Sequence, residues 1–586
     1  MEKAKSRLPA RKLLRMGKRL VLLVAFLFGV AYLKYVAEFS SSTWYTARVI
    51  PNDGCSSACR SARGYKFSVK PDTEPFAYIV GSEFGTKTIN PGDCVCVHAV
   101  VPPKTDGNAG TANSTLYRPI PGYPADSIML DLVLRTTRDE NGNEDALYKG
   151  SHVTVPVDLY AKSDDRDPTR AHIYQGTARL YDPGVYDVDA RLDYRNGEWN
   201  AEPHQDSVPY GETRMKTTIP SNEFVLSQVH VKLDVKHPTY LKRHQNLPLC
   251  TRGDEAGRWI PEANLPSTWQ KWQYMFPAED GRVWLPYHCR MRRISHPEFT
   301  LYMSARYSSI HWYGDSNSRR TLRPFLSSGR WCHKKSQLSR IDCLCNDAPK
   351  DLFPDEWYSN MPVPHWYRIH SDGVRSSEIY SDLRNLPVDP TDERPIVEKD
   401  PIREDYLPDY VPPGYSLRND YFDLYYLFTR GTLDMQGSFW DRDITRRNIS
   451  QYREASLVVV QIVTWDAAFG NWTWFTKQVV RMADRLKSVY PRARFIYRSG
   501  PFWCCRMSDD PEKKYDRLRF QAFDRLARKT FVKKLSAQVW DVTESHRCRS
   551  PEMKRYSENM PCKSAHSRAE VIHLDNQILM NMLVNG

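Results

Sequence analysis

The stretch Ala455–Trp465, ASLVVVQIVTW, decides the fold of this 586-residue chain. It is an almost unbroken apolar run, which is typical of a strand covered on both faces in a parallel sheet. The residues that follow predict a helix over Trp472–Val489 and a second strand over Ala493–Ser499. A charged helix over Lys513–Leu535 and a third strand over Ala537–Val542 continue the alternation. This order of strands and helices indicates a doubly wound α/β sheet.

A different pattern precedes this sheet, from residue 42 to residue 236. The segments His152–Ala161 and Gly184–Tyr194 alternate apolar and polar side chains, as half-buried strands do. Four cysteines could join this region by disulfide bonds, namely Cys55, Cys59, Cys94 and Cys96. We expect an all-β, immunoglobulin-like sandwich for placement or binding, followed by the α/β domain over residues 247–586. The proline-rich, acidic stretch 371–416 is interpreted as an exposed insertion in that domain.

The net charge of +13 is concentrated at the N-terminus. Residues 1–40 contain nine Lys or Arg and two Glu, so the other 546 residues carry only +6. A nucleic-acid partner requires a much denser positive surface. The composition therefore argues against nucleic-acid binding.

The basic tail, residues 1–19, precedes an apolar segment over residues 20–37 that only Lys34 interrupts. Eighteen helical residues reach about 27 Å, which suits a thin bilayer if the lysine extends to the interface. The positive charge predicts a cytosolic tail and a luminal remainder, which is a single-pass type II signal-anchor in the endoplasmic reticulum or Golgi membrane. A cleaved signal peptide is the alternative, although no small-x-small cleavage site follows the apolar run.

Cysteines and glycosylation sequons agree with a luminal location. All 13 cysteines lie beyond the apolar segment, and sequons occur at Asn113, Asn448 and Asn471. The cysteine spacings do not match zinc sites, and the sequence has no glycine-rich phosphate loop and no His/Asp cluster. We expect disulfide bonds, and neither a metal nor a cofactor.

The candidate chemistry begins in Ser308–Leu326, SSIHWYGDSNSRRTLRPFL. The segment runs from a predicted strand through a Gly-Asp-Ser turn into a predicted helix, so Ser316 lies where helix N–H groups can stabilise an oxyanion. A serine needs a base to act as a nucleophile. His573 is the candidate base, because Glu570 stands three residues earlier and can orient its imidazole. The pairing predicts hydrolase or acyl-transfer chemistry.

Several residues near these candidates allow other interpretations. His311 should point away from Ser316, because side chains alternate along a strand, and His566 lacks a suitably spaced carboxylate. Asp315 is interpreted as a structural turn residue rather than a base. Arg498 either lines the site or forms a surface ion pair. A lone Gly-Asp-Ser is most often an ordinary turn, so its meaning depends on the surrounding pattern.

The Gly-Asp-Ser turn with Arg319 behind it, together with an acid-x-x-His near the C-terminus, resembles the GDSL/SGNH superfamily. The PC-esterase branch is the most similar, and it includes the plant trichome-birefringence-like polysaccharide O-acetyltransferases. The segments Leu249–Ile260 and Trp284–Cys289 resemble the opening Cys–Gly-x-Trp and Trp-x-Pro…Cys motif of that branch. The preceding β-region resembles the arrangement of the neurexophilin and PC-esterase (NXPE) proteins.

The resemblance implies an SGNH-like sheet and a serine acyl-enzyme that transfers or removes O-acetyl groups on a glycan or polysaccharide in the secretory pathway. The acetyl donor stays unidentified. It implies catalytic roles for Ser316, His573 and Glu570, and a Cys250–Cys289 disulfide. It also implies oxyanion or binding roles for three residues, namely Gln461, Arg319 and Gly314.

The predicted central strand departs from the family pattern. Relatives carry an Asn and a Gly that serve the oxyanion, whereas this chain has Gln461 and Val463 in that register. Gln461 can donate through its amide with a different reach, and losing one oxyanion donor typically lowers a rate about a hundredfold or more. A second glycine donor is not located. Two other functions therefore stay open: a catalytically inactive glycan- or protein-binding relative, and an adhesion protein whose β-region carries the function.

Overall fold

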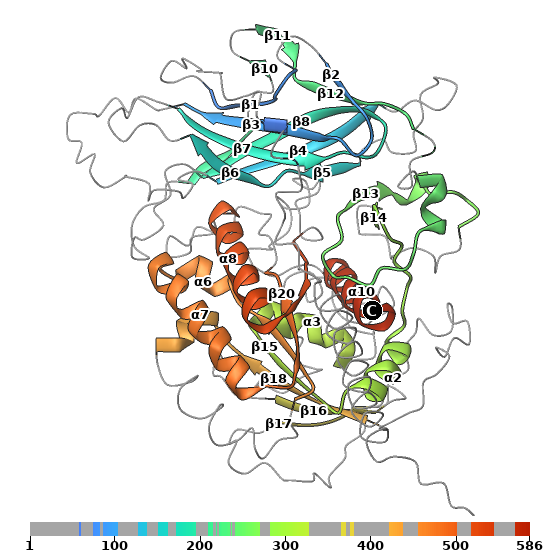
Figure 1. Ribbon diagram of the computed structural model, residues 1–586, viewed down its shortest axis with the longest axis vertical. Coiled ribbons are helices and arrows are strands. Elements are labelled where there is room, and N and C mark those ends of the chain that lie inside the picture. The colour runs from blue at the N-terminus through green and yellow to red at the C-terminus, as the bar shows by residue number, and fades with distance from the viewer. Residues whose placement is uncertain are drawn as a thin grey trace, which may run out of the picture. The chain divides into compact units, whose positions relative to one another are not determined.

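The computed structural model describes residues 55, 58–59, 74–82, 86–102, 127–136, 151–161, 171–194, 209–214, 218–219, 222–234, 236, 241–269, 282–326, 365–370, 375–379, 421–436, 455–500, 517–543 and 569–586. They comprise a β-rich region and an α/β domain (Figure 1). The predicted N-terminal tail and apolar segment 20–37 lie outside these residues. No helix within the described ranges has the length and apolarity to cross a membrane.

The α/β domain is organised around a sheet with the strand order β17-β16-β18-β15-β19-β20-β21. Five neighbouring strands in it are parallel: β18 (Tyr421–Phe428), β15 (Ser309–Gly314), β19 (Leu457–Gln461), β20 (Arg494–Arg498) and β21 (Gln538–Trp540). The predicted parallel α/β sheet is therefore confirmed. Numbered along the chain, these strands follow the order 2-1-3-4-5, so the order reverses between β15 and β19. Open sheets of this kind hold ligands outside the carboxyl ends of the strands at the reversal.

Helices cover both faces of the sheet (Figure 1). On one face, α7 (Trp472–Val489) and α8 (Arg517–Leu535) pack Phe475 and Phe523 against Val458 and other strand residues. On the other face are α2 (His296–Arg306), α3 (Ser316–Leu326) and α10 (Ala569–Asn585). The two faces differ because successive side chains of a strand point to opposite sides. The sheet is thus doubly wound, as predicted.

The predicted helix over Trp472–Val489 is confirmed at both ends. Its N-cap is Asn471, whose side chain accepts a hydrogen bond from the Trp474 N–H at 3.2 Å. The predicted apolar strand is shorter than its hydrophobic run, because a short helix, α6 (Thr464–Phe469), begins three residues after β19.

The edge of the sheet corrects one interpretation. β16 (His365–His370) pairs antiparallel with β18, and β17 (Arg375–Ile379) pairs antiparallel with β16. β17 lies within the stretch 371–416 that was interpreted as an exposed insertion. Those five residues belong to the sheet instead, because their backbone groups complete the ladder of β16. The rest of that stretch lies outside the described residues.

The β-rich region contains two larger sheets. One has four antiparallel strands in the order β1 (Phe76–Ile79), β3 (Cys94–Val101), β7 (His172–Arg179) and β6 (Val157–Ala161). The other has β2 (Lys87–Ile89), β12 (Gln228–Val231), β8 (Gly184–Tyr194), β4 (Ser127–Thr136) and β5 (His152–Thr154), with β9 (Pro209–Arg214) paired to β8. A small hairpin of β10 (Thr218–Ile219) and β11 (Asn222–Leu226) accompanies them. The β-rich character of this region is as predicted.

Two details of the β-rich region follow from its sequence. The strand predicted over His152–Ala161 is split between the two sheets, because Pro156 has no N–H to donate to a ladder. The four cysteines form two disulfides, and their pairing is Cys55–Cys94 and Cys59–Cys96. The sequence predicted that these cysteines form disulfide bonds but did not predict which cysteines pair.

The α/β domain opens with a hairpin of β13 (Gly257–Pro261) and β14 (Arg282–Pro286). The Cys250–Cys289 disulfide that the resemblance implied lies beside this hairpin and is confirmed. Arg258 of β13 forms a fully buried ion pair with Asp182, from the turn before β8, at 3.3 Å. The hairpin is therefore linked to the β-rich region by paired buried charges.

Candidate functional site

Ser316 is the first residue of α3, and it follows the loop residue Asp315 at the end of β15. The Asp315 carboxylate accepts a hydrogen bond from the Asn317 backbone N–H at 2.8 Å. This bond is the one by which an N-cap residue starts a helix. Asp315 is thus a structural turn residue, as predicted, and it fixes Ser316 at the helix N-terminus.

Gly314 is required here by close packing. A Cβ at this position would lie 2.0 Å from the Ser318 Oγ atom, far inside van der Waals contact. Glycine therefore lets the first turn of α3 lie directly against the end of β15. The predicted oxyanion or binding role of Gly314 stays a prediction.

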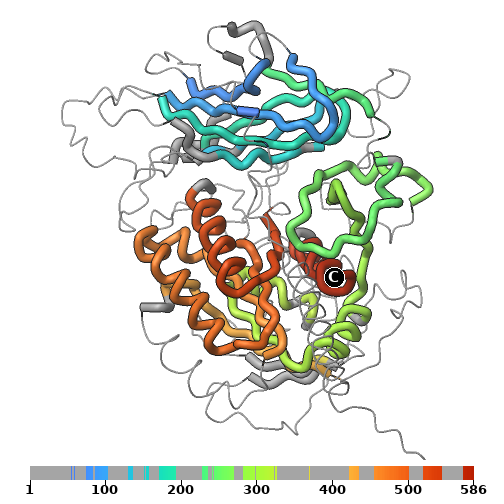
Figure 2. The backbone as a smooth tube through the Cα atoms, viewed as in Figure 1, coloured from blue at the N-terminus to red at the C-terminus, as the bar shows by residue number. Residues whose placement is uncertain are grey.

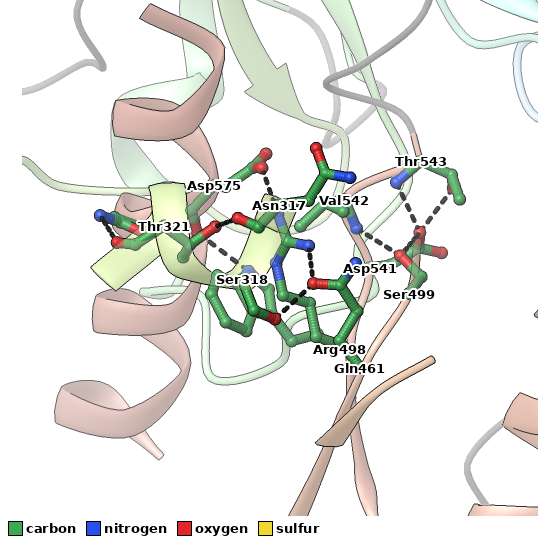
Figure 3. A network of polar contacts seen from close by, with 12 residues as sticks. Asn317, Ser318, Thr321, Gln461, Arg498, Ser499, Asp541, Val542, Thr543 and Asp575 are labelled. Atoms are coloured by element: carbon green, nitrogen blue, oxygen red, sulfur yellow. Dashed lines mark hydrogen bonds and ion pairs between the residues drawn. The ribbon is translucent and has the colours of Figure 1, made fainter. Parts of the chain in front are cut away.

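A buried polar network joins the first turn of α3 to the ends of β19 and β20 (Figure 3). Gln461, the last residue of β19, donates from Nε2 to Asp315 Oδ1 at 3.0 Å. Its Oε1 atom accepts hydrogen bonds from Arg498 Nη1 at 2.7 Å and from the Ser318 hydroxyl at 2.5 Å. The Gln461 amide therefore holds β15, α3 and β20 in register.

Arg498, the last residue of β20, extends the network to α10. Its Nη2 atom pairs with Asp575 Oδ2 at 3.0 Å, and its guanidinium lies 5.0 Å from the centre of the Trp540 ring. The Trp540 indole N–H donates to the Asp575 carbonyl at 2.9 Å. The side chains of the pair are 1% and 0% exposed, so the interpretation of Arg498 as part of a surface ion pair is wrong.

Sequence reasoning did not select Asp575. No local signal marks it, because α10 contains several other polar residues, among them Asn576 and Gln577, and the buried pair with Arg498 appears only in the fold. Burial lowers the pKa of Arg498, and the charges of Asp575 and then Asp315 oppose this effect. Burial raises the pKa of Asp315, against hydrogen bonds from Thr464 and Asn317 and the charge of Arg498.

His573 lies early in α10, and the direction of that helix places it at the carboxyl edge of the sheet. Asp575 contacts the last residues of β20 and β21. Farther along α10, Leu583 shares a small apolar cavity with Leu457, the first residue of β19. These contacts indicate that α10 runs from the carboxyl edge of the sheet back toward its amino edge, as α3 does after β15. Figure 2 traces the backbone of the chain. His573 consequently lies at the same edge and on the same face as Ser316.

The two helices also touch, because Asn576 of α10 donates from Nδ2 to the Thr321 carbonyl of α3 at 3.0 Å. Every residue from 309 to 322 is buried except Ser316, which is partly exposed. Every residue from 572 to 583 is buried except His573, which is also partly exposed. The predicted nucleophile and base are thus the partly exposed members of two buried segments. Glu570 falls within α10, but its side chain lies outside the described residues.

The two residues expected in the oxyanion register have other partners. Both donor contacts of the Gln461 amide are internal, to Asp315 and, at 3.4 Å, to the Thr464 hydroxyl. The Val463 N–H donates to Asp466 Oδ2 at 3.1 Å. Val463 has φ of 91°, a conformation that β-branched residues rarely adopt. The backbone therefore keeps a shape suited to glycine although valine occupies the position.

Arg319, a predicted binding residue, is buried, and its guanidinium lies 5.6 Å from the centre of the Phe428 ring at the end of β18. The next loop residue, Thr429, donates its N–H to the Gly314 carbonyl at 3.0 Å. Gly431 follows with φ of 74°. Sequence analysis located neither β18 nor this glycine. The apolar run Tyr421–Phe428 was the signal available.

His311 lies on the opposite face of the sheet from α3. Its Nδ1 atom is 2.7 Å from the Tyr490 hydroxyl, and burial lowers its pKa to about 3. The prediction that His311 points away from Ser316 is therefore confirmed. His566 lies outside the described residues.

The predicted glycosylation sites are described only in part. Asn471 is exposed at the start of α7, and its Oδ1 atom is the helix cap. Asn113 and Asn448 lie outside the described residues. Glycosylation at all three sites stays a prediction.

No family model matches the chain, and no curated protein matches its sequence. The resemblance to the PC-esterase branch therefore stays a prediction from motifs. In the described part of the chain, no group of three or more His, Cys, Asp and Glu could hold a metal ion. A serine hydroxyl at a helix N-terminus and an imidazole at the same sheet edge are groups suited to acyl transfer.

Proposed function

We propose that the α/β domain is an SGNH-like serine enzyme of the PC-esterase type that transfers or removes O-acetyl groups on a glycan or polysaccharide. One observation carries the proposal: Ser316 and His573 are the partly exposed residues of two buried segments that meet at one edge of the sheet. That edge lies at the reversal of strand order, where α/β sheets bind their ligands.

The chemistry would proceed through an acyl-enzyme. The Ser316 hydroxyl oxygen attacks the acetyl carbonyl carbon while its proton passes to His573, and the carbonyl oxygen becomes an oxyanion beside the N-terminus of α3. The bond from the carbonyl carbon to the leaving sugar oxygen then breaks, and His573 returns the proton to that oxygen. Water or a second sugar hydroxyl then accepts the acetyl group. Which acceptor enters decides between esterase and transferase.

The decisive experiment measures acetyl release from, and transfer between, O-acetylated polysaccharides by the luminal part of the chain. Replacing Ser316 with Ala should lower the turnover number about 10⁴-fold or more, as removal of a nucleophile does in serine enzymes. His573→Ala should lower it similarly. Ser488→Ala is the matched control, because Ser488 is exposed on α7 across the sheet. An unchanged rate in Ser316→Ala rejects the proposal.

The structure contains a specific observation that favours a second function. Gln461 and Val463 donate within the protein, so the donors expected for an oxyanion are occupied. A catalytically inactive relative that binds a glycan or protein would retain the fold with such changes. A fluorophosphonate probe distinguishes the two functions: labelling at Ser316 that His573→Ala abolishes supports the enzyme, and no labelling supports the binding protein.

The location and partners belong to the same proposal. We propose that residues 20–37 anchor the chain as a type II protein in the Golgi or endoplasmic reticulum membrane, with a glycan acceptor in the lumen. The three disulfides support an oxidising compartment. We also propose an immunoglobulin-like binding or placement role for residues 42–236. The two larger sheets of this region, one of them four antiparallel strands, support the β-sandwich part of this proposal.

A further inference from the structure

Asn317 is the residue next to Ser316, and its side chain is buried with no partner among the residues that the structure describes. It is 3% exposed, yet in the described part of the chain neither Nδ2 nor Oδ1 has a hydrogen bond. Figure 3 draws no dashed line to its amide, although the neighbouring polar groups are connected. Buried side-chain amides are nearly always hydrogen-bonded, so an exception requires an explanation.

The position of Asn317 relates it to both candidate groups. The Asn317 backbone carbonyl accepts a hydrogen bond at 2.9 Å from the hydroxyl of Thr321, which lies one turn later in α3. The Thr321 backbone carbonyl in turn accepts the hydrogen bond from Asn576 of α10. Asn317 thus lies about one turn before Thr321 on α3. His573 lies about one turn before Asn576, the residue of α10 that contacts Thr321. The Oδ1 atom of Asn576 is likewise buried with no hydrogen bond to any described residue. Where α3 and α10 meet, the amide of Asn317 and the Oδ1 atom of Asn576 are therefore buried hydrogen-bonding groups without a described partner, close to the proposed nucleophile.

We propose that the Asn317 amide contacts the acyl substrate and donates from Nδ2 to the carbonyl oxygen as it becomes an oxyanion. This inference rests on the proposed function and supplies the donor that it lacks, because the amide of Gln461 and the N–H of Val463 are committed elsewhere. The ligand class is an O-acyl ester. Its carbonyl oxygen can accept but not donate, so it satisfies the Nδ2 group.

The stability of the resting protein separates this role from a structural one. An amide that waits for substrate contributes no hydrogen bond to the folded state, so replacing it with an apolar group of similar shape is close to neutral or stabilising. Asn581 on α10 offers the matched contrast. Its amide is buried and fully used, accepting from the Arg292 N–H at 3.0 Å and donating to the Arg292 carbonyl at 2.8 Å.

The experiment compares Asn317→Leu, Asn317→Asp and Asn581→Leu in the full chain, using an O-acetylated polysaccharide as the probe. Both Asn317 variants should lower kcat about a hundredfold or more with little change in KM, because the donor acts on the oxyanion rather than on bound substrate. Asn317→Leu should keep the melting temperature of the parent. Asn581→Leu should melt earlier but keep the parent kcat while folded.

The outcomes are distinguishable. If the parent turns over in a Ser316-dependent way and the Asn317 variants match its kcat, the role of Asn317 is overturned and the enzyme assignment stands. If Asn317→Leu loses stability as Asn581→Leu does, or fails to fold, the amide is structural and the inference is overturned as well. If the parent shows no Ser316-dependent turnover, the proposed function fails and the oxyanion role fails with it.

Discussion

The two faces of the parallel sheet are both covered by helices, yet they are packed in different ways. On the α7–α8 side, the strands contribute mostly rings and aliphatic groups, which pack against residues such as Phe475 and Phe523, whose ring centres are 4.5 Å apart. The buried charges on that side, Arg528 with Asp524 and Asp541, come from α8 and from the loop after β21. Against α3 and α10, the carboxyl ends of the strands contribute buried polar groups, including Gln461 and Arg498. The same strands supply both faces, so the difference comes from their last residues.

This difference separates what holds the fold from what serves a site. Apolar packing tolerates substitutions of similar volume, whereas a buried charge must keep its partner. The polar face lies where the strand order reverses and beside Ser316 and His573. A protein that needed only a stable sheet would gain little from placing arginine and aspartate there, since apolar residues often replace such pairs without loss.

The largest expected effect tests the polar face. Arg498→Met removes one charge of the pair with Asp575 and leaves that carboxylate buried, which should lower the free energy of unfolding by about 3–5 kcal/mol. Adding Asp575→Leu should recover much of this loss, because no charge then stays unpaired. Guanidinium denaturation followed by circular dichroism measures both variants.

Met482→Leu supplies the comparison on the other face. Met482 is fully buried in α7, and exchange of residues of similar volume should cost less than about 1.5 kcal/mol. If Arg498→Met cost as little as Met482→Leu, the two faces would not differ in the way their packing indicates.

The sequence predicted the covered strands and the helix boundaries of the α7 face because periodicity reports burial directly. The Ala455–Trp465 run marked the central strand, and Trp472–Val489 matched α7 at both ends. The strand β18 was missed. It is inserted into the sheet on the far side of β15, and no local pattern specifies which strands become neighbours.

The candidate site was predicted in its chemistry but not in its supports. Ser316 and His573 came from short motifs that the fold brings to one sheet edge. Asp575 and Asn317 could not be selected, because a polar residue in a helix reads as solvent-exposed until tertiary contacts show what buries it. Val463 shows the same limit, since its positive φ is set by contacts such as the one from its N–H to Asp466.

The buried pair of Arg258 and Asp182 tests the effect of buried charge on stability through its dependence on pH. Burial raises the pKa of Asp182 to about 6, against the charge and hydrogen bond of Arg258. Between the ordinary value of 3.8 and about 6, the folded state binds more protons than the unfolded state, so this group's contribution to stability falls as pH rises through that window. The difference corresponds to about 3 kcal/mol.

Asp182→Asn isolates that contribution because the amide does not titrate. We expect the free energy of unfolding of the variant, minus that of the parent, to increase by about 3 kcal/mol between pH 3.5 and pH 7. Urea denaturation at several pH values measures this difference. A difference between the two proteins that stays constant with pH would show that the buried carboxylate keeps its ordinary pKa.

The smallest effect concerns Val463, where the two faces meet at the end of β19. Its side chain packs in the α7–α8 cluster, while its backbone has φ of 91°. At most buried positions glycine is less stable than alanine by about 0.5–1 kcal/mol, because it loses more freedom on folding. At a positive φ the order should reverse, so Val463→Gly should unfold at a higher denaturant concentration than Val463→Ala. Val460, buried in β19 with ordinary strand geometry, should show the usual order. If both positions prefer alanine, the valine conformation carries no strain, and the glycine-like backbone at the reversal of strand order loses its support.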